Sequence, residues 1–190
     1  GCSFGGNIIP FALENPKAEV VGIDLSNVQI EEGNRIIRYL SLKNIKLIHQ
    51  NVLEFDIKLG KFDYIICHGV FSWVNKEVQH GILNVIKNHL SENGSAIISY
   101  NTYPGWKNLQ VVRDVMLFRD EILKARGEQI NKNNAVRYGR GAIEFLGQFS
   151  ILNEKIKAGI TDISEKDDYY ILHEYLEDTN QPMYLYEFNK

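Results

Sequence analysis

The sequence predicts an α/β fold in its first half and a mostly helical region in its second half. Short apolar runs alternate with helical apolar patterns up to about residue 107, a Gly-rich turn opens the chain, and the alternation stops after Trp106. Strands that are separated by helices need crossover connections, so the sheet should be mostly parallel and covered on both faces. We therefore expect an incomplete α/β core over residues 1–107 and a helical extension over 108–190.

The composition excludes several classes of protein. The 190 residues are 44% hydrophobic and 24% charged, which is enough apolar surface to bury a core and too much for a disordered chain. No apolar run approaches the ~18 residues of a membrane span. The net charge of −3 predicts no general attraction to nucleic acid or anionic lipid. The two cysteines lie far apart and do not indicate a disulfide scaffold, so we expect a cytoplasmic protein.

The elements of the first half follow from apolar spacing and capping residues. Pro10 is tolerable in the first turn of a helix over 8–14, and Ser26 with Gln29 fits a capping box for a helix that ends near residue 40. Asn75 is a candidate cap for a third helix. Strands are expected over residues 19–24, 45–49, 62–67 and 96–100, with a turn over 91–94.

The second half shows helical spacing with polar interruptions. Leu109, Val112 and Met116 recur on one helical face. Residues 127–134 are polar and predict a linker, and residues 135–178 predict further helices. The tail over 182–188 predicts a strand or the start of another element.

The opening turn suggests that the chain is a fragment. It starts at Gly1 without an initiator Met, whereas Gly-rich turns of this kind follow a strand. In the sheet order 3-2-1-4-5 that strand would be central, so the second and fourth strands of that order would lack a partner between them. We therefore expect the isolated chain to bind a nucleoside cofactor weakly, with an N-terminal segment missing.

Glycines and an acid mark a nucleotide-type site. Gly1, Ser3, Gly5 and Gly6 open a helix, and Asp24 ends the following strand, 23 positions after Gly1. Small residues let the backbone approach a ligand closely, and a carboxylate at this place accepts both ribose hydroxyls. The glycines lie closer together than the third glycine of G-x-G-x-x-G would allow. This spacing favours a ligand without a pyrophosphate, such as S-adenosylmethionine, over a nicotinamide dinucleotide.

Two further pairs follow later strands. Asn51 and Val52 could address an adenine edge through a side-chain amide and a backbone N–H, although Asn51 is equally well explained as an ordinary turn residue. His68 and Gly69 follow the third strand, at the edge where open α/β sheets bind ligands, and Gly69 permits close approach of the backbone.

Two stretches carry a family resemblance. Residues 62–74 (FDYIICHGVFSWV) and 99–106 (SYNTYPGW) resemble class I S-adenosylmethionine-dependent methyltransferases with a regulatory domain, a family that includes rickettsial lysine methyltransferases of outer-membrane protein. Residues 170–177 and the positions Asn180, Pro182 and Tyr184 resemble the start of the regulatory or middle region. The resemblance implies a Rossmann-like core, methyl transfer from S-adenosylmethionine and a protein-lysine acceptor.

The aromatic stretch supplies the groups that an amine acceptor needs. Tyr100, Tyr103 and Trp106 can form walls, Asn101 offers a hydrogen-bond acceptor, and His68 completes the expected substrate side. Only a neutral amine has a lone pair, and an apolar aromatic pocket lowers the pKa of an amine by desolvation. For Trp106 a position in the core under a helical lid is at least as good an interpretation.

The remaining candidates have structural interpretations. His80 and His89 lie nine apart, which is not metal-ligand spacing, and should be solvated; His49 also lacks a partner at such spacing. Cys67 should be a core residue, and Cys2 could touch a cofactor only through its backbone. His173–Glu174 should be structural, and Arg137–Arg140 a solvated helix face. No metal is expected.

Other functions remain open. A nucleic-acid or small-molecule acceptor on the same fold is one alternative, because a fold does not choose its acceptor. A non-catalytic fragment that pairs with a separate N-terminal piece is another.

Overall fold

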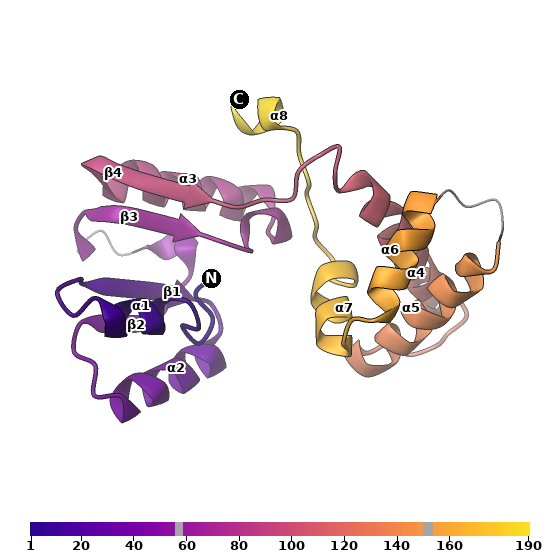
Figure 1. The fold of residues 1–190 in the computed structure, drawn as a ribbon, viewed down its shortest axis with the longest axis horizontal. Coiled ribbons are helices and arrows are strands. Elements are labelled where there is room, and N and C mark those ends of the chain that lie inside the picture. The colour runs from indigo at the N-terminus through magenta and orange to yellow at the C-terminus, as the bar shows by residue number, and fades with distance from the viewer. Residues whose placement is uncertain (56–58, 150–153) are drawn as a thin grey trace. The chain divides into compact units, whose positions relative to one another are not determined.

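The computed structural model describes residues 1–55, 59–149 and 154–190. The chain divides into two compact units, Gly1–Tyr100 and Asn101–Lys190, and each is described by itself. The first unit holds the strands with helices α1–α3, and the second holds helices α4–α8 (Figure 1). The domain boundary expected at residue 107 stays a prediction.

The elements of the first unit lie close to their predicted positions. The helices are α1 (Ile8–Glu14), α2 (Asn27–Tyr39) and α3 (Lys76–His89), and the strands are β1 (Val20–Asp24), β2 (Ile45–His49), β3 (Phe62–Cys67) and β4 (Leu90–Ile98). Ser26 and Asn75 cap α2 and α3 as predicted, through Gln29 N and Val78 N. The prediction for β4 was wrong at its start, because the expected turn over 91–94 lies within the strand. The register against β3 shifts there, between Phe62 and Tyr64.

The four strands form two separate two-stranded parallel sheets. β1 pairs with β2 from Val20↔Ile45 to Asp24↔His49, and β3 pairs with β4 (Figure 1). The predicted parallel pairing is confirmed, and β1 and β3 are not paired with each other.

Gly1 contacts the end of β1 and the loop that follows β3. Its ammonium donates to Ile23 O at 2.8 Å, and an ideal Cβ on Gly1 would lie 2.4 Å from Val70 Cγ2. Cys2 N also donates to Ile23 O, at 2.9 Å. The opening turn therefore lies against the end of β1 and against the loop that follows β3.

The β1–β2 half has its own apolar core. The buried residues of this core come from α1, α2 and β2, and they are Ile9, Ala12, Ile30, Ile37, Ile45 and Leu47. Burial of such side chains contributes about 25 cal/mol per Å² of apolar area and holds α1 and α2 against the sheet. This packing places the turn before α1 beside the carboxyl end of β1.

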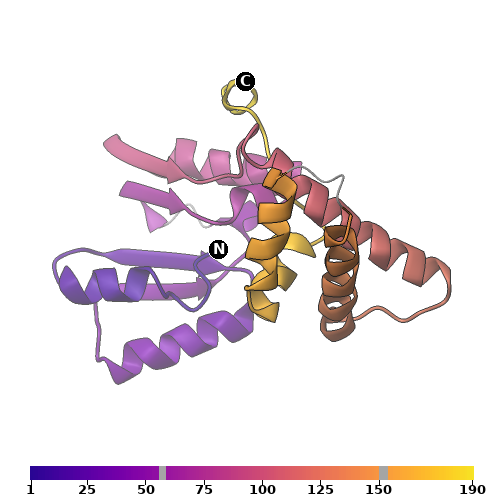
Figure 2. The same cartoon turned by 45° about the vertical axis from the view of Figure 1, so that its right-hand side comes forward.

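The second unit is a helical cluster of α4 (Lys107–Ala125), α5 (Lys132–Gly147), α6 (Glu154–Ser164), α7 (Asp168–Tyr175) and the short α8 (Leu185–Phe188). Helices α4 and α5 pack side by side (Figures 1 and 2). Their buried core is formed by Val112, Met116, Val136, Ile143, Ile163, Ile171 and Tyr175. Along the described part of the chain, no helix is both long enough and apolar enough to cross a membrane.

One prediction for the second unit needs correction. The polar linker is shorter than 127–134, because α5 already begins at Lys132. Asn131 and Asn134 exchange backbone-to-side-chain hydrogen bonds of 2.7 and 3.1 Å, which satisfy N–H groups at the start of the helix. In the tail, Met183 forms a single parallel bridge with Thr102, and α8 follows.

Candidate active site

The Asp24 carboxylate is bound directly to the opening turn. Ser3 N donates to Oδ2 at 2.7 Å, and Ser26 N donates to Oδ1 at 2.9 Å. The side chain is 16% exposed, so it remains accessible from solvent. A carboxylate has about four lone-pair positions, and these backbone bonds use one on each oxygen. Asp24 can therefore accept further hydrogen bonds from ligand hydroxyl groups.

The opening turn has a left-handed backbone at two positions. Ser3 has a φ of 51° and Gly5 a φ of 86°. A Cβ on Gly5 would also lie 3.0 Å from Ile9 and 3.2 Å from Leu47, so glycine is needed there for both conformation and packing. The Ser3 hydroxyl donates to Gln29 Oε1 at 3.0 Å, which ties the turn to α2. In the expected capping box the Gln29 side chain would accept a hydrogen bond from Ser26 N. In the structure the Gln29 side chain accepts from the Ser3 hydroxyl, and Ser26 N donates to Asp24.

The loop after β3 reaches the end of β4. Gly69 N donates to Ser99 Oγ at 2.9 Å, and Ser99 N donates to Cys67 O at 2.9 Å. Gly69 has a φ of 69°, and a Cβ there would meet nothing within 4 Å, so its backbone faces open space. His68 is exposed beside it. Because Val70 lies against Gly1, the loop and the opening turn meet at the carboxyl ends of the strands, where open α/β sheets bind ligands.

Asn51 acts as a turn residue in this structure. Its Oδ1 accepts from Leu53 N at 3.1 Å and caps the 3-10 turn η1 (Val52–Glu54). Gln50 N donates to Asp24 O at 2.9 Å, which places this segment next to the end of β1. An adenine contact by Asn51 or Val52 stays a prediction.

The expected substrate residues after Tyr100 form a cluster with the C-terminal tail. Asn101 Nδ2 donates to Asn180 Oδ1 at 3.1 Å, and Tyr103 N donates to Met183 O at 3.1 Å. Trp106 is half-buried at the start of α4. Sequence spacing alone did not pair Asn101 with Asn180, because the contact joins residues that are far apart in the chain.

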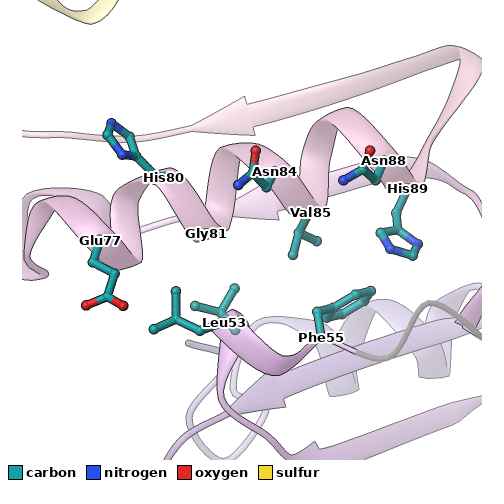
Figure 3. Close-up of a pocket in the computed structure, with 10 residues that line it drawn as sticks. Leu53, Phe55, Glu77, His80, Gly81, Asn84, Val85, Asn88 and His89 are labelled. Carbon is teal, nitrogen blue, oxygen red and sulfur yellow. The ribbon is translucent and has the colours of Figure 1, made fainter.

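A cavity of about 370 Å³ lies between α3 and residues 52–55 (Figure 3). Val52 belongs to the expected cofactor site and lies in its lining, which also includes Leu53, Phe55 and Gly81. His80 is exposed at this place, as expected. The prediction for His89 was wrong, because only 5% of it is exposed: its Nδ1 lies 2.8 Å from Gly60 O, and its ring packs edge-on to Phe55.

The other candidates have structural roles. Burial raises the pKa of the thiols of Cys2 and Cys67, which does not favour reactive thiolates. His173 Nδ1 pairs with Glu177 Oε1 at 3.0 Å. Arg140 is less solvated than expected, since it bonds Asp168 at 2.8 Å and Lys166 O at 2.6 Å. Within residues 1–55, 59–149 and 154–190 no three His, Cys, Asp or Glu residues are placed to hold a metal ion.

The candidate site lies at the carboxyl ends of parallel strands in an α/β unit, where open α/β sheets bind ligands. Residues 1–96 match the methyltransferase domain family, and residues 167–190 match a predicted methyltransferase regulatory domain. The first match covers just over half of the chain, and the chain belongs to the methyltransferase domain family.

Solved and curated relatives agree with this assignment. PKMT2 from Rickettsia typhi in complex with AdoHcy is 36% identical, with a TM-score of 0.84 over 99% of this chain and 36% of that one. The Rickettsia prowazekii protein RP789, itself uncharacterized, is 41% identical over 99% of this chain and 34% of its own length. RP028 of the same organism, also uncharacterized, is 39% identical over 99% of this chain and 75% of its own length. The likeness to PKMT2 confirms the class I methyltransferase fold.

The match in length is partial for two of these proteins. The chain spans about a third of RP789 and of PKMT2.

Proposed function

We propose that this chain forms the S-adenosylmethionine-binding part of a methyltransferase whose acceptor is a lysine amine of a surface or outer-membrane protein. The observation that carries the proposal is the contact between the Asp24 carboxylate and the opening turn, which also lies against the loop over 68–70. The AdoHcy bound to PKMT2 supports the choice of cofactor, because AdoHcy is S-adenosylmethionine without its methyl group. Two free cysteines agree with a cytoplasmic location.

The residues at the strand ends fit such a cofactor. When bound, the cofactor supplies a methyl group on a sulfonium, which is the electrophile of the reaction. Asp24 has acceptor capacity for the ribose hydroxyls, and Gly69 presents its backbone to open space. Gly1, Ser3 and Gly6 would let the ligand approach the turn, and Asn51 with Val52 would address the adenine.

The acceptor has to lose a proton before it can attack. A lysine amine is protonated at neutral pH, and only its neutral form has the lone pair that bonds to a methyl carbon as the carbon–sulfur bond breaks. Tyr100, Tyr103, Trp106 and His68 would line the approach of this amine and exclude water, which lowers the pKa of the amine by desolvation. The side-chain oxygen of Asn101 would accept a hydrogen bond from an N–H group of the amine.

Titration with AdoHcy, followed by amide NMR, tests the cofactor site. We expect shifts at Ser3, Asp24 and Gly69. Asp24→Asn should weaken binding about tenfold or more, because hydrogen bonds to a charged acceptor contribute about 1.5–3 kcal/mol. The matched control is Glu19→Gln, which removes an exposed carboxylate just before the opposite end of β1 and should leave the affinity unchanged. Equal affinities for Asp24→Asn and the unmodified chain would count against the site.

Methyl transfer from radiolabelled S-adenosylmethionine tests the acceptor. We expect label in a lysine-rich outer-membrane protein and none in bulk tRNA. Reductive methylation of the protein's lysines beforehand should abolish the signal, since it removes the primary amines. Label in tRNA alone would replace the protein acceptor with a nucleic acid and leave the cofactor site intact.

A further inference from the structure

Two tyrosines of the second unit lie next to one lysine ammonium. Lys107 Nζ lies 5.6 Å from the ring centroid of Tyr103 and 5.6 Å from that of Tyr184, and the two centroids are 5.4 Å apart. A cation within about 6 Å of an aromatic centroid is attracted by the electron-rich face of the ring. We call Tyr103 and Tyr184 the tyrosine pair.

The backbone holds the tyrosine pair together. Thr102 and Met183 form a parallel bridge, with Tyr103 N donating to Met183 O and Met183 N donating to Asn101 O, each at 3.1 Å. Tyr184 N donates to Glu187 Oε2 at 2.7 Å, which secures the start of α8. One tyrosine therefore comes from the SYNTYPGW stretch and the other from the segment that matches the regulatory domain.

Lys107 reaches the tyrosine pair from the surface of the second unit. Its side chain is exposed at the first residue of α4. A hydrogen bond with Tyr184 is the main cause that raises the pKa of Lys107, so its ammonium stays protonated beside the rings. Tyr186 stacks on Tyr184, with their centroids 5.5 Å apart, and extends the aromatic surface.

We propose that the tyrosine pair is a binding site for the side chain of a methylated lysine, and that Lys107 occupies this site until such a side chain displaces it. A primary ammonium is strongly hydrated, whereas a methylated ammonium keeps its charge and sheds water more easily, so it competes well for two aromatic faces. The inference rests on the proposed function, because it names where the modified side chain of the acceptor is held.

Binding of Nα-acetyl-Nε-trimethyllysine amide to the full chain tests the proposal, with the tyrosine ring resonances followed by NMR. Lys107→Gln should tighten binding about fivefold, because it removes the internal competitor. The neutral analogue with a tert-butyl group in place of the trimethylammonium should bind about fivefold more weakly than the cation. Equal affinity for cation and neutral analogue, or no gain with Lys107→Gln, would overturn the proposal.

Three variants complete the experiment. Tyr184→Leu should lose most of the affinity, and Tyr184→Phe should keep it, because the ring face remains; if the leucine variant does not fold, Tyr184→Phe and Lys107→Gln still decide the outcome. Lys190→Gln is the matched control, since Lys190 Nζ lies 5.3 Å from Tyr186 and should not affect the pair. The binding assay contains no cofactor, so its result does not depend on methyl transfer. Loss of the binding site and loss of methyl transfer can therefore be told apart.

Discussion

At the scale of the residue, Gly33 shows how one side chain can be constrained by a distant turn. It lies buried inside α2, where a Cβ would come within 2.3 Å of Leu47 Cδ1 and 2.5 Å of Phe4 O. Phe4 belongs to the opening turn, so Gly33 lets α2 pack directly against the candidate cofactor site. The sequence did not point to this constraint, because nothing in the spacing of α2 refers to Phe4.

We predict that Gly33→Ala lowers the free energy of unfolding by about 1–3 kcal/mol, the usual cost of overpacking against backbone. Gly141 in α5 is the matched control, because a Cβ there would meet nothing within 4 Å. Gly141→Ala should raise stability by about 0.5–1 kcal/mol through improved helix propensity. Urea denaturation measures both values, and a neutral Gly33→Ala would contradict the close approach of α2 to the turn.

At the scale of the element, α4 carries buried polar groups that no amphipathic pattern revealed. Arg113 is 3% exposed, and its Nη1 donates to Tyr175 O at 2.6 Å, while Nη2 donates to Glu177 O. It thereby fixes the end of α7 to α4. The apolar spacing of Val112 and Met116 correctly predicted the buried face of this helix. It did not predict that Arg113 shares that face, because the partners of Arg113 lie more than sixty residues later.

Asp120 on the same helix predicts a dependence of stability on pH. It is 7% exposed, and among the described residues its Oδ1 has no hydrogen-bond partner. Burial raises the pKa of Asp120 and the charge of Lys124 opposes this, so the folded state favours the protonated acid. The contribution of this group to stability is present below about pH 4 and is lost as the pH rises above the raised pKa.

Asp120→Asn should therefore stabilise the chain at pH 7 by on the order of 1 kcal/mol, because it removes a buried charge and keeps the shape. The difference should vanish near pH 3, where the acid is protonated in both states. Glu121→Gln, an exposed neighbour on α4, is the control. Denaturation at the two pH values measures the effect, and an equal change at both would show that the charge of Asp120 is not its cause.

At the scale of the whole chain, the described strands form two separate parallel sheets. Among the described residues, β1 and β3 each pair on one side alone, and Gly1 contacts the end of β1 and the loop that follows β3. The expected lack of a partner between the second and fourth strands of the order 3-2-1-4-5 agrees with the two separate sheets, and the missing N-terminal segment stays a prediction. The N–H and C=O groups along an unpaired strand edge can form hydrogen bonds with another strand. An added parallel strand could therefore pair with the free edges of β1 and β3.

We predict that the chain by itself binds AdoHcy weakly and that a fused N-terminal strand strengthens binding at least tenfold. The extension would be a five-residue apolar strand ending in Asp, which matches the length of β1. It would hold the turn, Asp24 and the loop over 68–70 in one rigid frame. An extension of five Gly and Ser residues is the control. Micromolar binding by the unextended chain, measured by calorimetry, would contradict the prediction.

The sequence by itself determined the order of the elements and the chemistry at their ends. Alternating apolar runs, the caps Ser26 and Asn75, and the SYNTYPGW stretch are local signals, and each acts within a few residues. Only the tertiary structure decided which other distant groups meet: Arg113 with Tyr175, His89 with Gly60, and Tyr103 with Tyr184. Such contacts depend on how elements that are tens of residues apart pack together. The spacing of residues within one element does not determine that packing.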